Sequence, residues 1–327
     1  MYAQRVTLYR QIERLRSSKV ITYVTSDRIG MQTQIADDAF DLLVNHLDQI
    51  GDTKRISLIM YTRGGNTLSA WGLINLIRLF CNELEIIIPS KCHSAGTLMS
   101  LGANRIIMTK QATLGPIDPS LNSPLNPQTM INGQMQTQSV SVEDVKGFIS
   151  IAKKEFGIED GKGLADILVS LGDKVHPLVL GNVYRAQSQI QMLATKLLAN
   201  QINDDEATSK IVSFLCSESG SHDYTINRNE ALELGLKIEK PDDELYQIIK
   251  AVYEDLKSDM QLSEPFNMEK ILGGMEQVQF TANRVFIEST DTHSDVFVSE
   301  GDISRITDQF GNQNIIPNVH FEGWRNQ

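Results

Sequence analysis

Three apolar runs in the first third of the chain each lead into a loop of chemically useful residues, and this repeated order constrains the fold more than any other feature. The runs cover residues 56–60, 86–89 and 105–108, and the loops that follow them cover residues 61–66, 92–96 and 114–119. Short apolar runs of this kind predict buried strands. If the strands are parallel, the three loops meet at one edge of the sheet.

Segments with helical periodicity separate these strands. We predict strands at 20–25, 56–61, 84–88 and 105–109, and helices at 34–50, 67–81 and 94–103. Regular alternation of strand and helix is typical of an α/β fold in which crossover helices join the strands of a parallel sheet. A basic amphipathic helix at residues 4–17 precedes this pattern.

The chain of 327 residues is long enough for one large domain and a smaller addition. We predict an α/β domain over 1–240 and a C-terminal α+β extension over 241–327, with strands around 277–287 and 295–298. The extension holds 16 acidic and 6 basic residues, which accounts for −10 of the formal charge of −11. Such an acidic region disfavours nucleic acid as a partner, because phosphates require clustered Lys and Arg.

Other features bear on location and cofactors. Three cysteines without metal-ligand spacing argue against a disulfide framework and favour a reducing compartment, so we expect a cytoplasmic protein. No window approaches the roughly 18 apolar residues of a transmembrane segment. The sequence shows no metal or nucleotide motif, and we predict neither a metal nor another cofactor.

A long polar stretch follows the third loop. Residues 119–142 contain no charged side chain and are dominated by Ser, Asn, Gln, Thr and Pro. We expect an extended loop there, either mobile beside the substrate or disordered.

Ser94 is the candidate nucleophile. It follows a predicted strand and opens a helix rich in small residues, so the amide of Ala95 would point toward negative charge developing on a substrate. The Gly64–Gly65 pair would supply a second amide at Gly65, because glycine lets the backbone approach a substrate closely. Taken alone, a serine at this position is usually a helix cap and a glycine pair only a turn. The ordered set points to acyl transfer.

These motifs resemble the Clp/crotonase superfamily of serine peptidases, and most closely the serine dehydrogenase proteinase family. The resemblance runs from about residue 56 to 238 and rests on four segments: 62–65, 94–103, 176–185 and 223–236. It implies a Clp/crotonase-like fold, a homo-oligomer, and cleavage of peptide bonds in a peptide or protein substrate by Ser94, with an oxyanion hole formed by Gly65 and Ala95.

The general base departs from the Clp pattern. Clp peptidases have a histidine about 25 residues after the serine, whereas here that turn carries Asp118. His222 precedes Asp223, which aligns with the Clp acid. We therefore predict a reordered triad in which His222 is the base and Asp118 orients it, since triads are defined by geometry and not by chain order.

Each candidate has an alternative. His176 could serve as the base or simply cap its helix, and Lys146 could form a Ser–Lys dyad of the signal-peptide-peptidase type. His93 should point away from its neighbour Ser94, and Cys92 reads as a small packed residue. A protein of the same fold could also lack peptidase activity and act as a binding scaffold, because fold does not settle function.

Overall fold

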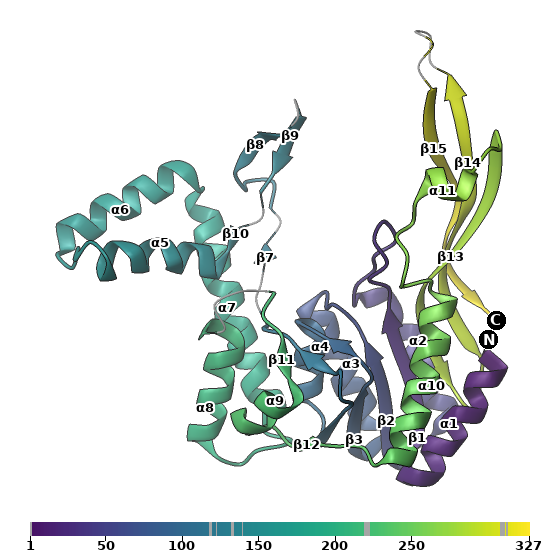
Figure 1. The fold of residues 1–327 in the computed structure, drawn as a ribbon. Coiled ribbons are helices and arrows are strands. Elements are labelled where there is room, and N and C mark those ends of the chain that lie inside the picture. Colours follow the sequence, from purple (N-terminus) through teal and green to yellow (C-terminus); the bar gives the residue numbers. More distant parts are fainter. Residues whose placement is uncertain are drawn as a thin grey trace. The chain divides into compact units, whose positions relative to one another are not determined.

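The computed structural model describes residues 2–117, 120–121, 123–131, 134–138, 140–218, 223–307, 311 and 313–327, without the side chains of 120, 121, 142, 143 and 218. Its contacts divide the chain into two compact units (Figure 1). Unit 1 contains residues 1–114 and 226–327, and unit 2 contains residues 115–225. The boundary predicted at residue 240 stays a prediction. The C-terminal strand at Gln277–Ser289 pairs directly with the first strand of the chain.

An eight-stranded sheet forms the centre of unit 1, in the order β12-β5-β3-β2-β1-β13-β14-β15. The first five strands are mutually parallel, as the strand–helix rhythm predicts, and the last three are antiparallel. The parallel strands are β1 (Lys19–Thr25), β2 (Thr53–Tyr61), β3 (Cys81–Ile88), β5 (Arg105–Met108) and β12 (Ile238–Glu239). The antiparallel strands are β13 (Gln277–Ser289), β14 (Ser294–Thr307) and β15 (Gln313–Asn326).

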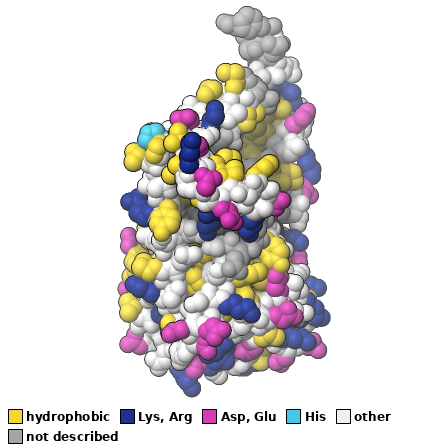
Figure 2. Space-filling view, turned by 90° about the vertical axis from the view of Figure 1, so that its left-hand side faces the viewer, with side chains coloured by type: hydrophobic (Ala, Val, Ile, Leu, Met, Phe, Trp, Pro, Cys, Tyr) yellow, Lys and Arg dark blue, Asp and Glu magenta, His cyan; other side chains and the backbone are white. Residues whose placement is uncertain are grey.

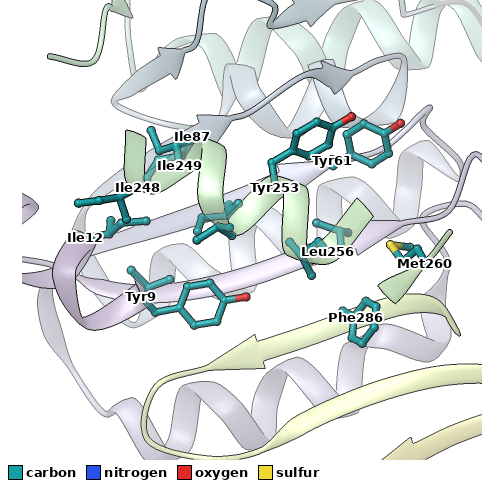
Figure 3. Packing of buried hydrophobic residues seen from close by; sticks show 14 of the residues in the cluster. Tyr9, Ile12, Tyr61, Ile87, Ile248, Ile249, Tyr253, Leu256, Met260 and Phe286 are labelled. Carbon is teal, nitrogen blue, oxygen red and sulfur yellow. The ribbon is translucent and has the colours of Figure 1, made fainter. Parts of the chain in front are cut away.

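Helices cover the parallel part of the sheet. α2 (Phe40–Ile50), α3 (Thr67–Leu79) and α4 (Ala95–Leu101) are the crossovers that join successive parallel strands, while α1 (Tyr2–Arg16) and α10 (Asp243–Asp259) lie together beside β1 and β2 (Figure 1). Figure 3 shows the core under these two helices, where Tyr9 and Ile12 of α1 and Leu256 of α10 meet Tyr61 and Phe286 from the sheet. Apolar residues at helical spacing on α1 and α10 thus meet every second residue of the strands.

A buried ion pair fastens α1 to this core. The guanidinium group of Arg5 donates to Glu288 on β13 at 2.7 and 2.9 Å, and the Tyr9 hydroxyl donates to the same carboxylate at 2.6 Å. Asp255 and Asp259 on α10 complete the contacts of the guanidinium. The basic helix predicted at residues 4–17 therefore buries one of its cations completely, which its basic amphipathic pattern did not reveal.

A second, three-stranded sheet lies at the carboxyl ends of the parallel strands. It consists of β4 (Lys91–Cys92), β6 (Thr113–Leu114) and β11 (Ile226–Asn227), in the order β11-β6-β4. α9 (Arg228–Leu234) follows β11; Asn227 caps its start and Gly235, with φ of 106°, ends it. This small sheet carries the loops in which the sequence predicts the active site.

The C-terminal region combines helices with antiparallel strands, as predicted. α10 is followed by α11 (Met268–Leu272) and by the meander β13–β14–β15. The strands are longer than the sequence indicated, and β15 was not predicted. Its residues are mostly exposed and polar, so pairing with β14 and not an apolar pattern makes them a strand.

Unit 2 is mainly helical. Its helices are α5 (Val142–Lys154), α6 (Gly161–Lys174), α7 (Pro177–Leu198) and α8 (Asp205–Ser213), followed by a π-helix at Phe214–Glu218. The polar stretch predicted as one long loop contains two short antiparallel pairs, β7 (Ser120–Leu121) with β10 (Val140–Ser141) and β8 (Gln128–Ile131) with β9 (Gln134–Thr137). Alternation of apolar and polar residues is absent there, which is why the strands were missed.

Hydrophobic side chains are exposed on the helices of unit 2. Figure 2 shows them interspersed with charged side chains on the face of the molecule that carries α5 and α6. They include Phe148 and Ile151 on α5 and Leu168 and Val169 on α6. Among the helices that the structure describes, none combines the length and the apolar character needed to cross a bilayer.

Candidate active site

Ser94 occupies a strained turn between β4 and α4. Its backbone angles are φ 51° and ψ −115°, a conformation that side chains with a β-carbon rarely adopt. A residue held this way costs about 1–3 kcal/mol, and such strain collects at functional sites. A nucleophilic serine on a tight turn between a strand and a helix is a known catalytic arrangement.

The Ser94 hydroxyl does not cap the helix that follows it. Although Ser94 is at the N-cap position of α4, its side chain accepts no hydrogen bond from the first turn, and the residue keeps 8% of its surface exposed. In contrast, the Asn66 side chain caps α3 by accepting from the N–H groups of Leu68 and Ser69. The simple explanation of Ser94 as a helix cap is therefore excluded.

Gly64 lies directly against Ser94. A β-carbon on Gly64 would be 2.7 Å from the Ser94 β-carbon and 3.2 Å from the Ala95 nitrogen, and the backbone of Gly64 has φ of 116°. Both the conformation and the space require glycine at this position. The structure thus brings Gly64, Ser94 and Ala95 together, and the catalytic roles of Ser94, Gly65 and Ala95 stay predictions.

Backbone pairing at the end of β2 holds these two loops together. The Thr62 N–H donates to the Lys91 carbonyl at 3.0 Å, and the His93 N–H donates to the Thr62 carbonyl at 3.1 Å. The Thr62 hydroxyl oxygen in turn accepts from the Gly64 N–H at 3.0 Å. Thr62 is therefore the residue that fixes the glycine loop against the serine loop, and sequence reasoning did not single it out.

Small residues let α4 approach this junction. A β-carbon on Gly96 would lie 2.5 Å from Thr62 Cγ2 and 2.9 Å from Cys92 Sγ. Ser100, one turn further along α4, donates to the Gly96 carbonyl at 2.9 Å. The run of small residues after Ser94 thus has a packing reason, namely the close contact between α4 and the end of β2.

The segment before α2 supports the second glycine from the other side. Ile35 forms a parallel bridge with Gly65, in which the Ile35 N–H donates to Gly64 and the Ile35 carbonyl accepts from Asn66. A β-carbon on Gly65 would overlap the Ile35 backbone at 2.3 Å. Because successive residues of an extended chain direct their polar groups to opposite sides, the N–H and carbonyl of Gly65 point away from Ile35. The sequence predicted a helix from residue 34, but this pairing keeps residue 35 extended.

The amides of Gly65 and Ala95 are available as donors. Within the described residues, neither N–H donates a hydrogen bond to another protein group. Main-chain donors near a reactive serine are the groups that stabilise an oxyanion in acyl transfer.

The histidine next to Ser94 faces elsewhere. His93 Nε2 lies 2.9 Å from the Thr113 hydroxyl on β6, so its ring is directed to the neighbouring strand, as alternation of side chains predicts. Cys92 is completely buried, and burial raises the pKa of its thiol to about 12. A thiol with this pKa stays protonated near neutrality, which identifies Cys92 as a packed residue and not a nucleophile.

The remaining predicted residues belong to unit 2 or lie outside the described residues. His176 Nδ1 accepts from the Leu178 N–H at 3.2 Å and so caps α7, while Lys146 Nζ donates to the Ser217 hydroxyl at 3.4 Å. Asp118 and His222 lie outside the described residues. Their roles, and the choice of the general base, stay predictions.

This architecture defines a mixed α/β protein of the ClpP/crotonase-like fold, with a mainly parallel sheet, C-terminal antiparallel strands and a serine at the start of a short helix. Residues 1–157, slightly less than half of the chain, match the family described as ClpP-like SDH-type serine proteinase. This region is therefore similar to that family, in agreement with the resemblance drawn from the motifs.

Individual relatives are more distant. An uncharacterized protein of Methanocaldococcus jannaschii is 27% identical over 241 residues, which is 72% of this chain and 73% of that protein. A mutant of the 1510-N membrane-bound stomatin-specific protease is 15% identical, with a TM-score of 0.39 over 74% of this chain and 86% of its own. ClpP1 from Listeria monocytogenes is 12% identical, with a TM-score of 0.37 over 72% of this chain and 99% of its own.

Proposed function

We propose that this protein is a serine peptidase in which Ser94 attacks the carbonyl carbon of a peptide bond. The observation that carries the proposal is the strained turn at Ser94, whose hydroxyl does not cap α4. This turn lies beside a glycine pair at which a β-carbon would overlap neighbouring atoms. The match of residues 1–157 to a serine proteinase family supports the same reaction class.

The proposed chemistry proceeds through an acyl-enzyme. A base removes the proton of the Ser94 hydroxyl as its oxygen bonds to the carbonyl carbon, and the carbonyl oxygen becomes an oxyanion. The N–H groups of Gly65 and Ala95 donate to this oxyanion. The intermediate collapses when the C–N bond breaks and the amine leaves with the proton, and water then hydrolyses the ester.

For the base we retain the prediction from the sequence, in which His222 takes the proton and Asp118 orients its imidazole. The alternatives are His176 and Lys146. His176 already uses Nδ1 to cap α7, which leaves Nε2 for another partner. Lys146 has a hydroxyl as a hydrogen-bond partner, and it would have to lose its proton to act as a base.

The substrate would bind as an extended peptide. The edge of residue 65 that faces away from Ile35 presents one N–H and one carbonyl, and a peptide strand pairs with such an edge through its own main chain. The expected substrate is therefore an unfolded or extended segment of a protein. A cytoplasmic location and a homo-oligomeric state stay predictions from the sequence and the family.

A fluorophosphonate probe tests the nucleophile. An activated serine reacts with this probe, so we expect one labelled site per chain in the native protein and none in Ser94→Ala. Ser100→Ala is the matched control, because Ser100 lies on the same helix and is hydrogen-bonded to the Gly96 carbonyl. Labelling that persists in Ser94→Ala would overturn the proposal, as would a folded native protein that neither labels nor cleaves peptides.

A second set of variants ranks the bases. His222→Ala should reduce peptide turnover by about 10²–10⁴-fold, the usual contribution of a general base, while His176→Ala and Lys146→Ala retain activity. If His222→Ala retains turnover, the reordered triad is wrong, and the variant that loses activity identifies the base instead.

A further inference from the structure

Two histidines and an aspartate of unit 1 lie close together, on elements other than those that carry Ser94. His46 lies on α2, while His293 and Asp295 lie at the hairpin between β13 and β14. One ligand atom from each of the three lies within 4.8 Å of the others. His46 is completely buried, Asp295 is nearly so, and His293 is partly exposed.

The distances among these atoms fit a divalent cation. His46 Nε2 is 3.2 Å and His293 Nε2 is 3.0 Å from Asp295 Oδ2. Ligands about 2.0–2.1 Å from a tetrahedral zinc ion are about 3.3 Å from one another. The two separations from Asp295 match that spacing, and the ligand atoms of the three residues all lie within 4.8 Å of one another.

The surroundings of His46 fix its ring for this role. Nδ1 lies 2.8 Å from the Ser289 hydroxyl and 2.7 Å from the Thr292 hydroxyl. Because a hydroxyl can both donate and accept, it satisfies Nδ1 whether or not that atom carries the proton. His46 can therefore carry its proton on Nδ1 and offer the lone pair of Nε2 to a metal ion. Hydrogen bonds that fix the orientation of the ring in this way are typical of zinc-binding histidines.

The cluster also has an open side. A surface depression of about 590 Å³ reaches His293 and Asp295 and is lined in addition by Asp48, Asp291 and Asn326. Lys19 pairs with Asp291 at 2.6 Å, so Asp48 adds its negative charge to that of Asp295. This opening gives a metal ion a path of entry and leaves room for water as a fourth ligand.

We propose that His46, His293 and Asp295 bind a zinc ion, or a first-row divalent ion of similar preference, which joins α2 to the β13–β14 hairpin. Two imidazoles and one carboxylate suit zinc and its neighbours, whereas Mg²⁺ prefers oxygen ligands. A histidine two residues before an aspartate was the only signal in the sequence, and the third ligand is far away at residue 46.

Metal binding by the full chain tests this directly. After treatment with a chelator and its removal, the protein is titrated with Co²⁺ and followed by visible absorption, and with Zn²⁺ followed by calorimetry. We expect one ion per chain, the visible bands of low-symmetry Co²⁺ that Zn²⁺ abolishes, and no comparable binding of Mg²⁺. Zn²⁺ at about a hundredfold excess over Kd should raise Tm by roughly 5 °C.

Variants locate the site. His293→Ala and Asp295→Asn should each weaken Zn²⁺ binding at least tenfold, and His293→Ala changes a partly exposed residue that the fold tolerates. His320→Ala is the matched control, because His320 pairs with Asp302 on the same sheet but, among the described residues, belongs to no cluster with a second imidazole. If the native chain takes up no ion, or if His293→Ala binds as the native chain does, the cluster is only a hydrogen-bonded network and the proposal fails.

Discussion

The α-carbon of Gly64 faces the β-carbon of Ser94 so closely that a methyl group on Gly64 would be 2.7 Å from it. We expect Gly64→Ala to destabilise the protein by about 1–3 kcal/mol, because φ of 116° and this contact both resist a side chain. The displaced Ser94 should label with a fluorophosphonate about 10²-fold more slowly, since small misplacements of a nucleophile have large effects. Chemical denaturation and labelling rates measure the two effects.

Gly72→Ala is the control for that substitution. Gly72 lies inside α3, and a β-carbon there would meet only the Phe40 ring at an ordinary 3.6 Å. Because alanine favours a helix over glycine by about 1 kcal/mol, this variant should be as stable as the native protein or more so, with unchanged labelling. Equal labelling losses in both variants would mean that the contact between Gly64 and Ser94 has no special role.

Ser94→Gly should separate stability from activity. Glycine adopts φ of 51° without strain, so we expect the free energy of unfolding to rise by about 1 kcal/mol while labelling disappears. Ser94→Ala keeps the β-carbon and hence the strain, and should abolish labelling without this gain. Urea unfolding of the two variants compares them, and a glycine variant no more stable than the alanine variant would contradict strain at this turn.

Breaking the ion pair between Arg5 and Glu288 should be costly. Arg5→Met leaves the completely buried carboxylate of Glu288 without its cation, and we expect a loss of about 3–5 kcal/mol in the free energy of unfolding. Adding Glu288→Gln to Arg5→Met should restore part of this loss, because no unpaired buried charge remains. The double-mutant cycle is measured by urea unfolding.

Arg325→Met provides the comparison for this network. Arg325 pairs with Glu300 at 2.6 Å, but both side chains are partly exposed, so this variant should lose no more than about 1 kcal/mol. Similar losses at Arg5 and Arg325 would show that burial does not control the strength of these pairs.

Alkaline pH should weaken the fold partly through Cys92. Burial raises the pKa of the thiol from 9.0 to about 12, so between these values the unfolded chain loses a proton that the folded chain keeps. Stability is unaffected below pH 9 and falls above it, by up to about 1.4 kcal/mol per pH unit for this group. Cys92→Ala should show a shallower decline between pH 9 and 11 in urea unfolding at several pH values. An identical slope would mean that the thiol titrates normally.

Local patterns predicted much of the fold. The apolar runs at residues 20–25, 56–61, 84–88 and 105–109 agree with β1, β2, β3 and β5 within a few residues, because buried parallel strands have a strong hydrophobic signal. The same approach failed for residue 35, which pairs with Gly65 instead of beginning a helix, and for β15, which is a strand only because β14 lies beside it. Pairing partners remote in the chain leave little trace in local sequence.

The sequence by itself determined the resemblance to the family and the parallel sheet, and it singled out Ser94 and the glycine pair as candidates. Each of these rests on short segments whose spacing and composition are physically restrictive. Only the tertiary structure decided that the Ser94 hydroxyl does not cap α4 and that Thr62 and Ile35 hold the glycine loop. It also decided that His46 lies beside His293 and Asp295. These relationships join residues from separate elements. Their geometry follows from how the helices and strands pack, which no local pattern encodes.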